Sequence, residues 1–343
     1  MTAALDATYS VGRNLSGVGV YSRELALSLA EAHPEARFLH CYRPHKFLHG
    51  LRSNRSANVS PRLLLETLPV RGAGLFHGLN QRMPAWRARS TVCTFHDLFV
   101  LTADYSTPEF RARFTAQARQ AVDRSDLIAC VSNYTAQMVE ELLNVDRSRI
   151  RVTPHGVRFP RKHSEARREK IILHVGAIQK RKNLVRLVEA FETGCGPDWR
   201  MVLAGSAGYG SEQVMARITA SPARARIEVT GWVDDATVLR LYTQASVFAF
   251  PSLDEGFGIP VLEAMAQATP VIASNRAALP EICGDAALMV DAFDVESISN
   301  ALNRITGDEA LRAELAAKGL DRVRQFTWAR TAELTWLIYQ ELI

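Results

Sequence analysis

A chain of 343 residues, 47% of them hydrophobic and 22% charged, has the composition of an ordinary globular protein and the length of two domains. No apolar run reaches ~18 residues, which excludes a membrane-spanning helix, and the basic residues lack the interleaved aromatics of a nucleic-acid site. The net charge of +5 lies unevenly, with +8 over residues 1–165 (22 Lys and Arg against 14 Asp and Glu) and −3 over the remainder. An anionic membrane surface, a phosphorylated substrate and plain solvated surface therefore stay open for the basic half.

The chain opens with a predicted strand, a glycine-containing loop and a helix. Residues 3–7 form the strand, the loop ends at Gly17-Val18-Gly19, and helical spacing continues over residues 20–30. This order combines free backbone N–H groups with the positive end of a helix dipole, which suits an anion. Gly17 and Gly19 are the candidate contacts, and a tight turn entering a helix is the alternative.

The next predicted strand covers residues 38–42, and residues 44–59 are expected to form a long basic loop. Two further strands end near residues 75–80 and 91–98. Ligands bind at the carboxyl ends of parallel strands, so His96 is a candidate site residue and His77 a weaker one. For His96 the alternative is a packed histidine that is hydrogen-bonded by Asp97.

The rest of this half alternates helices and strands, with Ser132-Asn133 as a helix cap. Helices are predicted at 109–122 and 134–143, and strands at 127–132 and 149–153. Residues 158–169 carry many charges and almost no apolar side chains, which is typical of a linker and marks a domain boundary.

The second half begins with a strand at 171–175, a turn at Gly176, a basic loop at 179–183 and a helix at 184–191. Lys180, Arg181 and Lys182 precede a helix N-terminus, where cations are unfavourable for the helix dipole. A bound anion such as a diphosphate would remove that conflict, and a solvated cluster is the alternative.

Further strands are predicted at 201–204, 227–230, 246–250, 271–273 and 287–290, with helices at 212–218 and 234–244 between them. Gly205 and the run Gly231-Trp232-Val233 end strands on the expected ligand edge, where backbone groups can contact a base. Two consecutive α/β halves of this kind predict two doubly wound domains.

The stretch 250–268 carries the strongest signal in the sequence. A buried strand ends at Pro251, Gly256 and Gly258 allow close approach of a ligand, and Pro260 suits a first helical turn. Glu255 and Glu263 flank this anion site. Carboxylates beside a phosphate site are misplaced unless they accept hydrogen bonds from ligand hydroxyls, as in a nucleotide sugar.

The run from Glu255 to Glu263 resembles the Glu-x7-Glu motif of the retaining GT-B glycosyltransferases of family four (glycosyl transferases group 1), and residues 251–253, 263–266 and 269–273 match as well. The resemblance covers nearly the whole chain. It implies two Rossmann-like domains facing a central cleft. Residues 1–160 would bind the acceptor, residues 161–325 the nucleotide sugar, and a helix in 326–343 would cross back onto the first domain.

The resemblance also implies a role for each candidate. Glu255 and His96 would contact the donor sugar, Glu263 the ribose, and Arg181 and Lys182 the diphosphate. The implied catalytic residues are Glu255, His96, Lys182 and Arg181, and the implied donor-binding residues are Gly17, Gly19, Gly176, Gly205, Trp232, Val233, Phe257, Gly258, Ile259 and Glu263. Some relatives carry an arginine directly after the glycine, where this chain has Ala177, so the site has fewer cations. With no evident carboxylate nucleophile, front-side displacement fits best.

The motifs Ser-Gly-Val-Gly-Val-Tyr, Phe-His-Asp-Leu, Val-Gly-x4-Arg-Lys-Asn and Thr-Gly-Trp-Val are similar to those of mannosyltransferases of bacterial surface polysaccharide and lipopolysaccharide. They imply transfer of mannose from GDP-mannose to a glycan or lipid-linked glycan. A nucleotide-sugar 2-epimerase of the same fold and a non-catalytic nucleotide-sugar-binding protein are the alternatives.

The sequence predicts no cofactor and no metal. It contains no Asp-x-Asp, and helix capping explains the adjacent Asp234 and Asp235. Five cysteines without C-x-x-C spacing indicate reduced thiols, and residues 1–8 lack the features of a secretory signal. These features predict a cytoplasmic protein, with peripheral contact at the inner face of the membrane left open.

Overall fold

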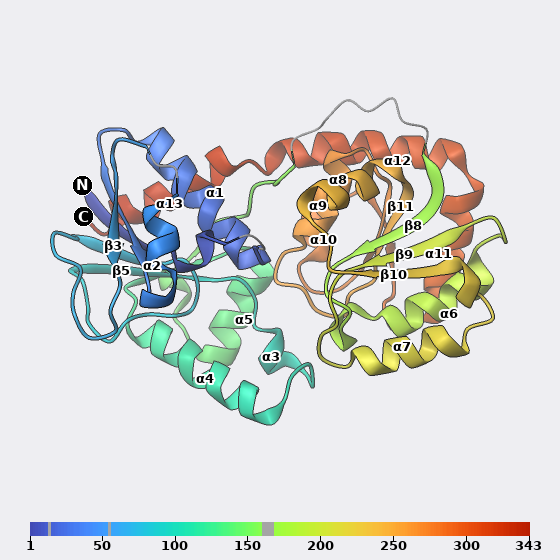
Figure 1. The fold of residues 1–343 in the computed structure, drawn as a ribbon, viewed down its shortest axis with the longest axis horizontal. Helices are drawn as coiled ribbons and strands as arrows, with labels where there is room; N and C mark the ends of the chain where they lie inside the picture. The colour runs from blue at the N-terminus through green and yellow to red at the C-terminus, as the bar shows by residue number, and fades with distance from the viewer. Residues whose placement is uncertain (13–14, 54–55, 160–167) are drawn as a thin grey trace. The chain divides into compact units, whose positions relative to one another are not determined.

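The computed structural model describes residues 1–12, 15–53, 56–159 and 168–343. The chain divides into two compact units, residues 1–156 with 326–343 and residues 157–325 (Figure 1). The boundary predicted at residue 160 lies outside the described residues, as does most of the predicted linker. Within the described part, no helix combines the length and the apolar character that a membrane span requires.

The first unit is built on a seven-stranded parallel sheet in the order β3-β2-β1-β4-β5-β6-β7. Its strands are β1 (Thr2–Asp6), β2 (Arg37–Tyr42), β3 (Val59–Leu63), β4 (Leu75–Gly78), β5 (Ser90–Phe95), β6 (Leu127–Cys130) and β7 (Ile150–Val152). Its helices are α1 (Gly17–Ala32), α2 (Pro44–Leu51), α3 (Phe99–Thr102), α4 (Pro108–Asp123), α5 (Asn133–Leu143) and α13 (Trp328–Glu341). The predicted strands of this half are confirmed.

Helix α1 starts earlier than predicted. Ser16 is its N-cap and accepts a hydrogen bond from the Gly19 N–H at 3.3 Å. Gly17 and Gly19 therefore belong to the first helical turn, and the prediction that they end a loop before residue 20 is wrong. The polar cap outweighs the low helix propensity of two glycines, because it satisfies an N–H group that the helix leaves unpaired.

The prediction of a long basic loop at 44–59 is also wrong. Pro44 opens helix α2 and residues 59–63 form strand β3. The helix packs closely, since a Cβ atom on Gly50 would lie 2.4 Å from the ring of Tyr42. The charged composition of this segment concealed a helix that packs against β2 through Gly50.

Helix α13 packs against α1 in the first unit (Figure 1). Tyr339 is fully buried, and its hydroxyl oxygen lies 2.7 Å from His77 Nδ1. Ser90 donates a hydrogen bond to the Leu342 carbonyl at 2.9 Å. The end of the chain thus supplies part of the core of the unit that the start of the chain forms.

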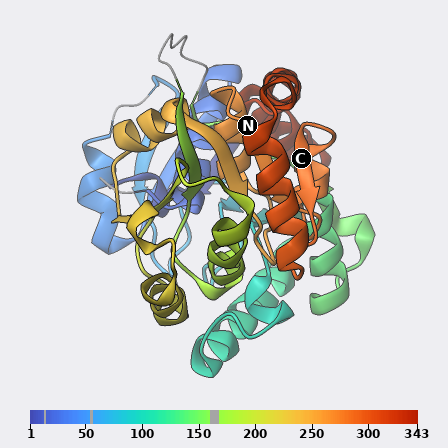
Figure 2. The same cartoon turned by 90° about the vertical axis from the view of Figure 1, so that its right-hand side faces the viewer.

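The second unit, which Figure 2 shows from a second direction, has a six-stranded parallel sheet. The strand order is β10-β9-β8-β11-β12-β13. Its strands are β8 (Glu169–Val175), β9 (Arg200–Ala204), β10 (Ile227–Gly231), β11 (Ala245–Phe250), β12 (Val271–Ser274) and β13 (Ala287–Val290). Its helices are α6 (Leu184–Gly194), α7 (Ser211–Ala220), α8 (Asp235–Gln244), α9 (Ile259–Ala266), α10 (Leu279–Cys283), α11 (Val295–Gly307) and α12 (Glu309–Arg322). The two doubly wound parallel sheets confirm the predicted fold class.

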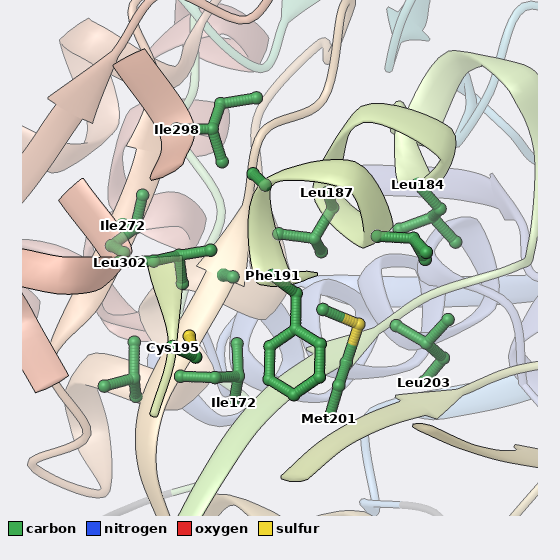
Figure 3. Close-up of a cluster of buried hydrophobic side chains, with 14 of the residues drawn as sticks. Ile172, Leu184, Leu187, Phe191, Cys195, Met201, Leu203, Ile272, Ile298 and Leu302 are labelled. Carbon is green, nitrogen blue, oxygen red and sulfur yellow. The ribbon is translucent and has the colours of Figure 1, made fainter. Parts of the chain in front are cut away.

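The core of the second unit lies between the sheet and helices α6, α7 and α11. Phe191 of α6 is fully buried beside Ile172, Cys195 and Met201 (Figure 3). Apolar side chains that recur every three or four residues on α6 give this helix one face to bury. All five cysteines of the chain are buried and form no disulfide, in agreement with the prediction of reduced thiols.

Candidate functional site

Three of the predicted site residues of the second unit form one buried ion cluster. The Glu255 carboxylate lies 2.8 Å from Arg181 Nη1 and 2.5 Å from Lys182 Nζ. Arg181 and Lys182 belong to a short 3-10 helix, η3 (Lys180–Lys182), after β8, and Glu255 follows β11. Strands β8 and β11 are neighbours in the parallel sheet, so their carboxyl ends bring these groups together.

This cluster is nearly inaccessible to solvent and strongly polarised. The three side chains are only 8–11% exposed. Burial by itself raises the pKa of Glu255, but the two cations outweigh burial and lower that pKa to about 2. Glu255 is therefore ionised at neutral pH, and the cluster keeps a net charge of +1.

The unfavourable charge that the sequence shows at the N-terminus of α6 is thus largely relieved inside the chain. The sequence predicts a bound anion that offsets Arg181 and Lys182, and in the structure the Glu255 carboxylate lies against both cations. The alternative of a solvated cluster is wrong for Lys182, because this side chain is buried and its Nζ lies 4.6 Å from the centre of the Phe250 ring.

Two glycines hold the turns after β8 and β9 in contact. A Cβ atom on Gly205 would lie 2.0 Å from the carbonyl oxygen of Gly176, so only glycine fits there. Gly176 has a φ of +151° and its N–H donates to the Ala204 carbonyl at 2.9 Å. Both glycines lie where the parallel strands end, at the edge that also holds the ion cluster.

The loop before α9 has the predicted form. Gly258 has a φ of +112° and precedes Ile259, with Pro260 in the first turn. No side chain caps this helix, and Phe257 is buried beside it. The first-turn N–H groups of α9 therefore lie at the same edge of the sheet as Glu255.

Glu263 is not an ordinary surface residue of α9, because it is 3% exposed. Arg158 Nε donates to its Oε1 at 2.8 Å, and the Tyr242 hydroxyl donates to its Oε2 at 3.0 Å. Burial raises the pKa of Glu263, while Arg158 and Tyr242 act in the opposite direction. The sequence does not indicate either partner, because Arg158 lies in the predicted linker and Tyr242 resembles a core residue of α8.

Trp232 and Val233 follow the end of β10 at this edge. Trp232 is 55% exposed, which is unusual for so large an apolar side chain. An exposed indole at a sheet edge offers a flat surface on which a base can stack.

The predicted site residues of the first unit are His96, Gly17 and Gly19. His96 lies just after β5 and is partly exposed, with Nε2 2.9 Å from the Leu79 carbonyl oxygen. Its ring stacks on that of His155 at 5.4 Å and meets the Tyr21 ring edge-on at 4.6 Å. Burial lowers the pKa of His96 to about 4, so the imidazole is neutral at pH 7.

His77, the weaker candidate, belongs to the interior of the first unit. It is fully buried, and its Nε2 lies 2.8 Å from the Thr94 hydroxyl oxygen. Burial, helped by the nearby His96, lowers the pKa of His77 to about 3. Its role is packing and hydrogen bonding.

Histidines whose pKa is lowered in the folded chain predict an early loss of stability in acid. The pKa values of His77, His96 and His174 in the folded chain, about 3, 4 and 4, lie below 6.5, the ordinary pKa of a histidine side chain. As the pH falls, these histidines therefore take up protons in the unfolded chain before they do so in the folded chain. Their contribution to the free energy of unfolding is complete above pH 6.5 and falls as the pH drops towards about 4. Each histidine contributes a slope of ~1.4 kcal/mol per pH unit in that window. Urea denaturation at a series of pH values measures this slope, and a flat profile from pH ~6.5 to ~5 would contradict the prediction.

Metal ligands do not gather in the described part of the chain. No group of three or more His, Cys, Asp or Glu side chains could hold an ion there. Asp234 is the N-cap of α8 and accepts from the Thr237 N–H at 2.8 Å, which confirms the capping role predicted for it.

Comparison with known protein families gives two matches that together cover most of the chain. The family described as Glycosyl transferases group 1 matches residues 158–322, and Glycosyltransferase Family 4 matches residues 15–159. These ranges correspond closely to the two sheet-bearing units.

Among curated proteins, O-antigen chain mannosyltransferase B of Escherichia coli is 28% identical, covering 98% of this chain and 99% of that protein. The serotype-specific mannosyltransferase WbdA of Escherichia coli is 30% identical over 71% of this chain, and the match spans about a third (32%) of the length of WbdA.

Solved structures are similar over the whole chain. A sucrose-phosphate synthase from Thermosynechococcus elongatus has a TM-score of 0.77 at 21% identity, covering 100% of this chain and 99% of the other. Anabaena Alr3699/HepE in complex with UDP has a TM-score of 0.73 at 15% identity, covering 99% of both. At 15–21% identity, this similarity shows the fold alone, and that fold is the predicted GT-B class.

Proposed function

The chain belongs to the glycosyltransferases that join a family 4 domain to a group 1 domain, and from this premise we propose that it transfers mannose from GDP-mannose with retention of configuration. The acceptor is a glycan or lipid-linked glycan of a surface polysaccharide. The names of two relatives, an O-antigen chain mannosyltransferase and a serotype-specific mannosyltransferase, support the sugar and the pathway.

The observation that carries the proposal is the buried cluster of Arg181, Lys182 and Glu255 at the carboxyl edge of the second sheet. Its net positive charge suits a diphosphate. Arg181 and Lys182 stabilise the negative charge that develops on the leaving diphosphate, and the N-terminus of α9, which no side chain caps, adds the positive end of a helix dipole. The Glu255 carboxylate orients both cations and accepts from the hydroxyls of the donor sugar.

The remaining donor contacts follow from the same arrangement. Glu263 accepts from the ribose hydroxyls, and the exposed Trp232 stacks on the base. His96, neutral at pH 7, contacts the donor sugar as a hydrogen-bonding group. The leaving phosphate takes the proton of the acceptor hydroxyl in a front-side displacement.

The test combines binding with transfer. A thermal-shift screen of nucleoside diphosphates identifies the base, because a ligand that binds only the folded state raises the melting temperature. GDP-mannose is then supplied with a lipid-linked glycan, and NMR of the product reports the anomeric configuration. An α-linked mannoside is expected. Conversion of the nucleotide sugar without an acceptor would indicate a 2-epimerase, and binding without turnover a non-catalytic protein.

We expect transfer to need no divalent metal. Arg181, Lys182 and the first turn of α9 offset the diphosphate charge that a metal ion offsets in other transferases. Activity in metal-free buffer with excess EDTA is expected to equal that in Mg²⁺ within about twofold, since the cationic groups are part of the chain. Loss of activity in EDTA that Mn²⁺ or Mg²⁺ restores would refute this expectation.

Peripheral contact with an anionic membrane is proposed for the first unit. Helix α2 presents Leu48 and Leu51, which are 66% and 41% exposed, next to the exposed Arg52. Apolar side chains beside a cation suit an anionic lipid surface. Flotation with phosphatidylglycerol vesicles is expected to recover the protein, and Leu48→Ser with Arg52→Ser to reduce recovery severalfold. Equal recovery with neutral phosphatidylcholine vesicles would contradict the proposal that electrostatic attraction to anionic lipid contributes to binding.

A further inference from the structure

The buried carboxylate of Glu263 is held by two donors on different elements. Arg158 Nε reaches Oε1 at 2.8 Å, and the Tyr242 hydroxyl reaches Oε2 at 3.0 Å. Tyr242 is fully buried, and the side chain of Arg158 is 13% exposed. Each carboxylate oxygen thus has one hydrogen bond from the chain.

Arg158 also contacts two side chains besides Glu263. Its Nη1 lies 3.0 Å from Asp235 Oδ1, at the start of α8, and its guanidinium stands 4.1 Å from the centre of the Phe159 ring. The side chain of Asp235 is 64% exposed, whereas that of Glu263 is 3% exposed. The guanidinium therefore joins an outer carboxylate to an inner one, with its Nε directed at the inner one.

An ionised carboxylate is an acceptor with about four lone-pair positions. Arg158 and Tyr242 occupy one position on each oxygen of Glu263, which leaves one on each for a ligand. Two free acceptors on one carboxylate match two hydroxyls on adjacent carbons. The 2′ and 3′ hydroxyls of a ribose have that arrangement.

We propose that Arg158 and Tyr242 are positioning residues that hold the buried Glu263 carboxylate and orient its two remaining acceptor positions towards the ribose hydroxyls of the donor nucleotide. The inference rests on the proposed function, which assigns Glu263 to the ribose. Without Arg158, burial favours the protonated acid, which donates one hydrogen bond and accepts fewer. The negative charge of Asp235 then raises the pKa of Glu263 further, because the Arg158 guanidinium no longer offsets it.

The experiment measures ribose preference, defined as the ratio of the dissociation constants of 2′,3′-dideoxy-GDP and GDP, by calorimetry. The wild-type chain is expected to prefer GDP by more than ~10-fold, since hydrogen bonds to a charged group are strong. In Arg158→Met the preference falls to within about threefold of unity, while the affinity for 2′,3′-dideoxy-GDP stays unchanged. The ribose preference of Tyr242→Phe is expected to lie between that of the wild-type chain and that of Arg158→Met. The preference of Arg158→Met recovers in part at higher pH, because the pKa of Glu263 rises without the guanidinium.

The matched control is Asp235→Asn, which removes the outer partner of Arg158 and leaves both hydrogen bonds to Glu263. It is expected to keep the wild-type preference. Unchanged preference in both Arg158→Met and Tyr242→Phe would overturn the inference. Equal loss of affinity for both ligands would assign the two residues a purely structural role and also overturn it.

Failure of the proposed function gives a different result. If the wild-type chain transfers mannose but shows no ribose preference, the assignment of Glu263 and this inference fail together, while the transfer activity stands. If the wild-type chain prefers GDP but no sugar is transferred, the activity fails and the positioning result stands. Melting temperatures of all variants exclude misfolding, and Tyr242→Phe, which removes a single oxygen atom, provides the test if Arg158→Met does not fold.

Discussion

Glu255→Gln is expected to lower the free energy of unfolding by about 3–5 kcal/mol and to reduce sugar transfer more than 10-fold. The substitution keeps the shape of the side chain but leaves Arg181 and Lys182 as buried cations without their common anion. Removing one partner of a buried ion pair is costly because the other partner cannot regain its hydration. The sequence predicts the loss of activity, and only the ion cluster predicts the loss of stability.

An added anion distinguishes this explanation from a general packing defect. Pyrophosphate is expected to raise the melting temperature of Glu255→Gln more than that of the wild-type chain, because loss of the Glu255 carboxylate raises the net positive charge of the cluster from +1 to +2. Glu169→Gln is the control: its ion pair with Arg200 joins side chains that are 48% and 45% exposed, and its loss costs ~0–1 kcal/mol. Equal stability of the two variants in urea would show that the Glu255 cluster contributes little.

Gly205→Ala is expected to destabilise the second unit by about 3–5 kcal/mol and to abolish nucleotide binding. The added methyl group would lie 2.0 Å from the Gly176 carbonyl oxygen and 2.5 Å from its carbonyl carbon. Both neighbours are backbone atoms, which cannot rotate away as a side chain does. The turns after β8 and β9 would separate, and the Gly176 turn leads into the segment that carries Arg181 and Lys182.

Two other glycines separate the steric effect from backbone strain. Gly231 has a φ of +69° with no atom near its Cβ position, so Gly231→Ala costs only the strain of ~1–2 kcal/mol. Gly307, at the end of α11, has neither constraint, and Gly307→Ala is expected to be neutral or slightly stabilising. Urea denaturation ranks the three variants. A Gly205→Ala variant no less stable than Gly231→Ala would show that the two turns separate without cost.

The local sequence determined most elements and several of their ends. Apolar runs mark the buried parallel strands, and polar caps fix the starts of helices at Ser132 and Asp234. The glycines before Pro260 likewise gave the loop that enters α9. These features depend on a few neighbouring residues, so they can be read without knowing the fold. The charged segment at 44–59 misled because its composition does not show that Gly50 of α2 packs against the Tyr42 ring of β2.

Only the tertiary structure decided which charges meet. Glu255 lies 73 positions from Lys182 in the sequence, and Glu263 lies 105 positions from Arg158. The first pair forms because β8 and β11 are neighbours in the sheet although they are not consecutive in the chain. Strand order leaves no periodic trace in a sequence. Burial then forces these carboxylates to take partners, since an ionised group removed from water is stable only when it is paired.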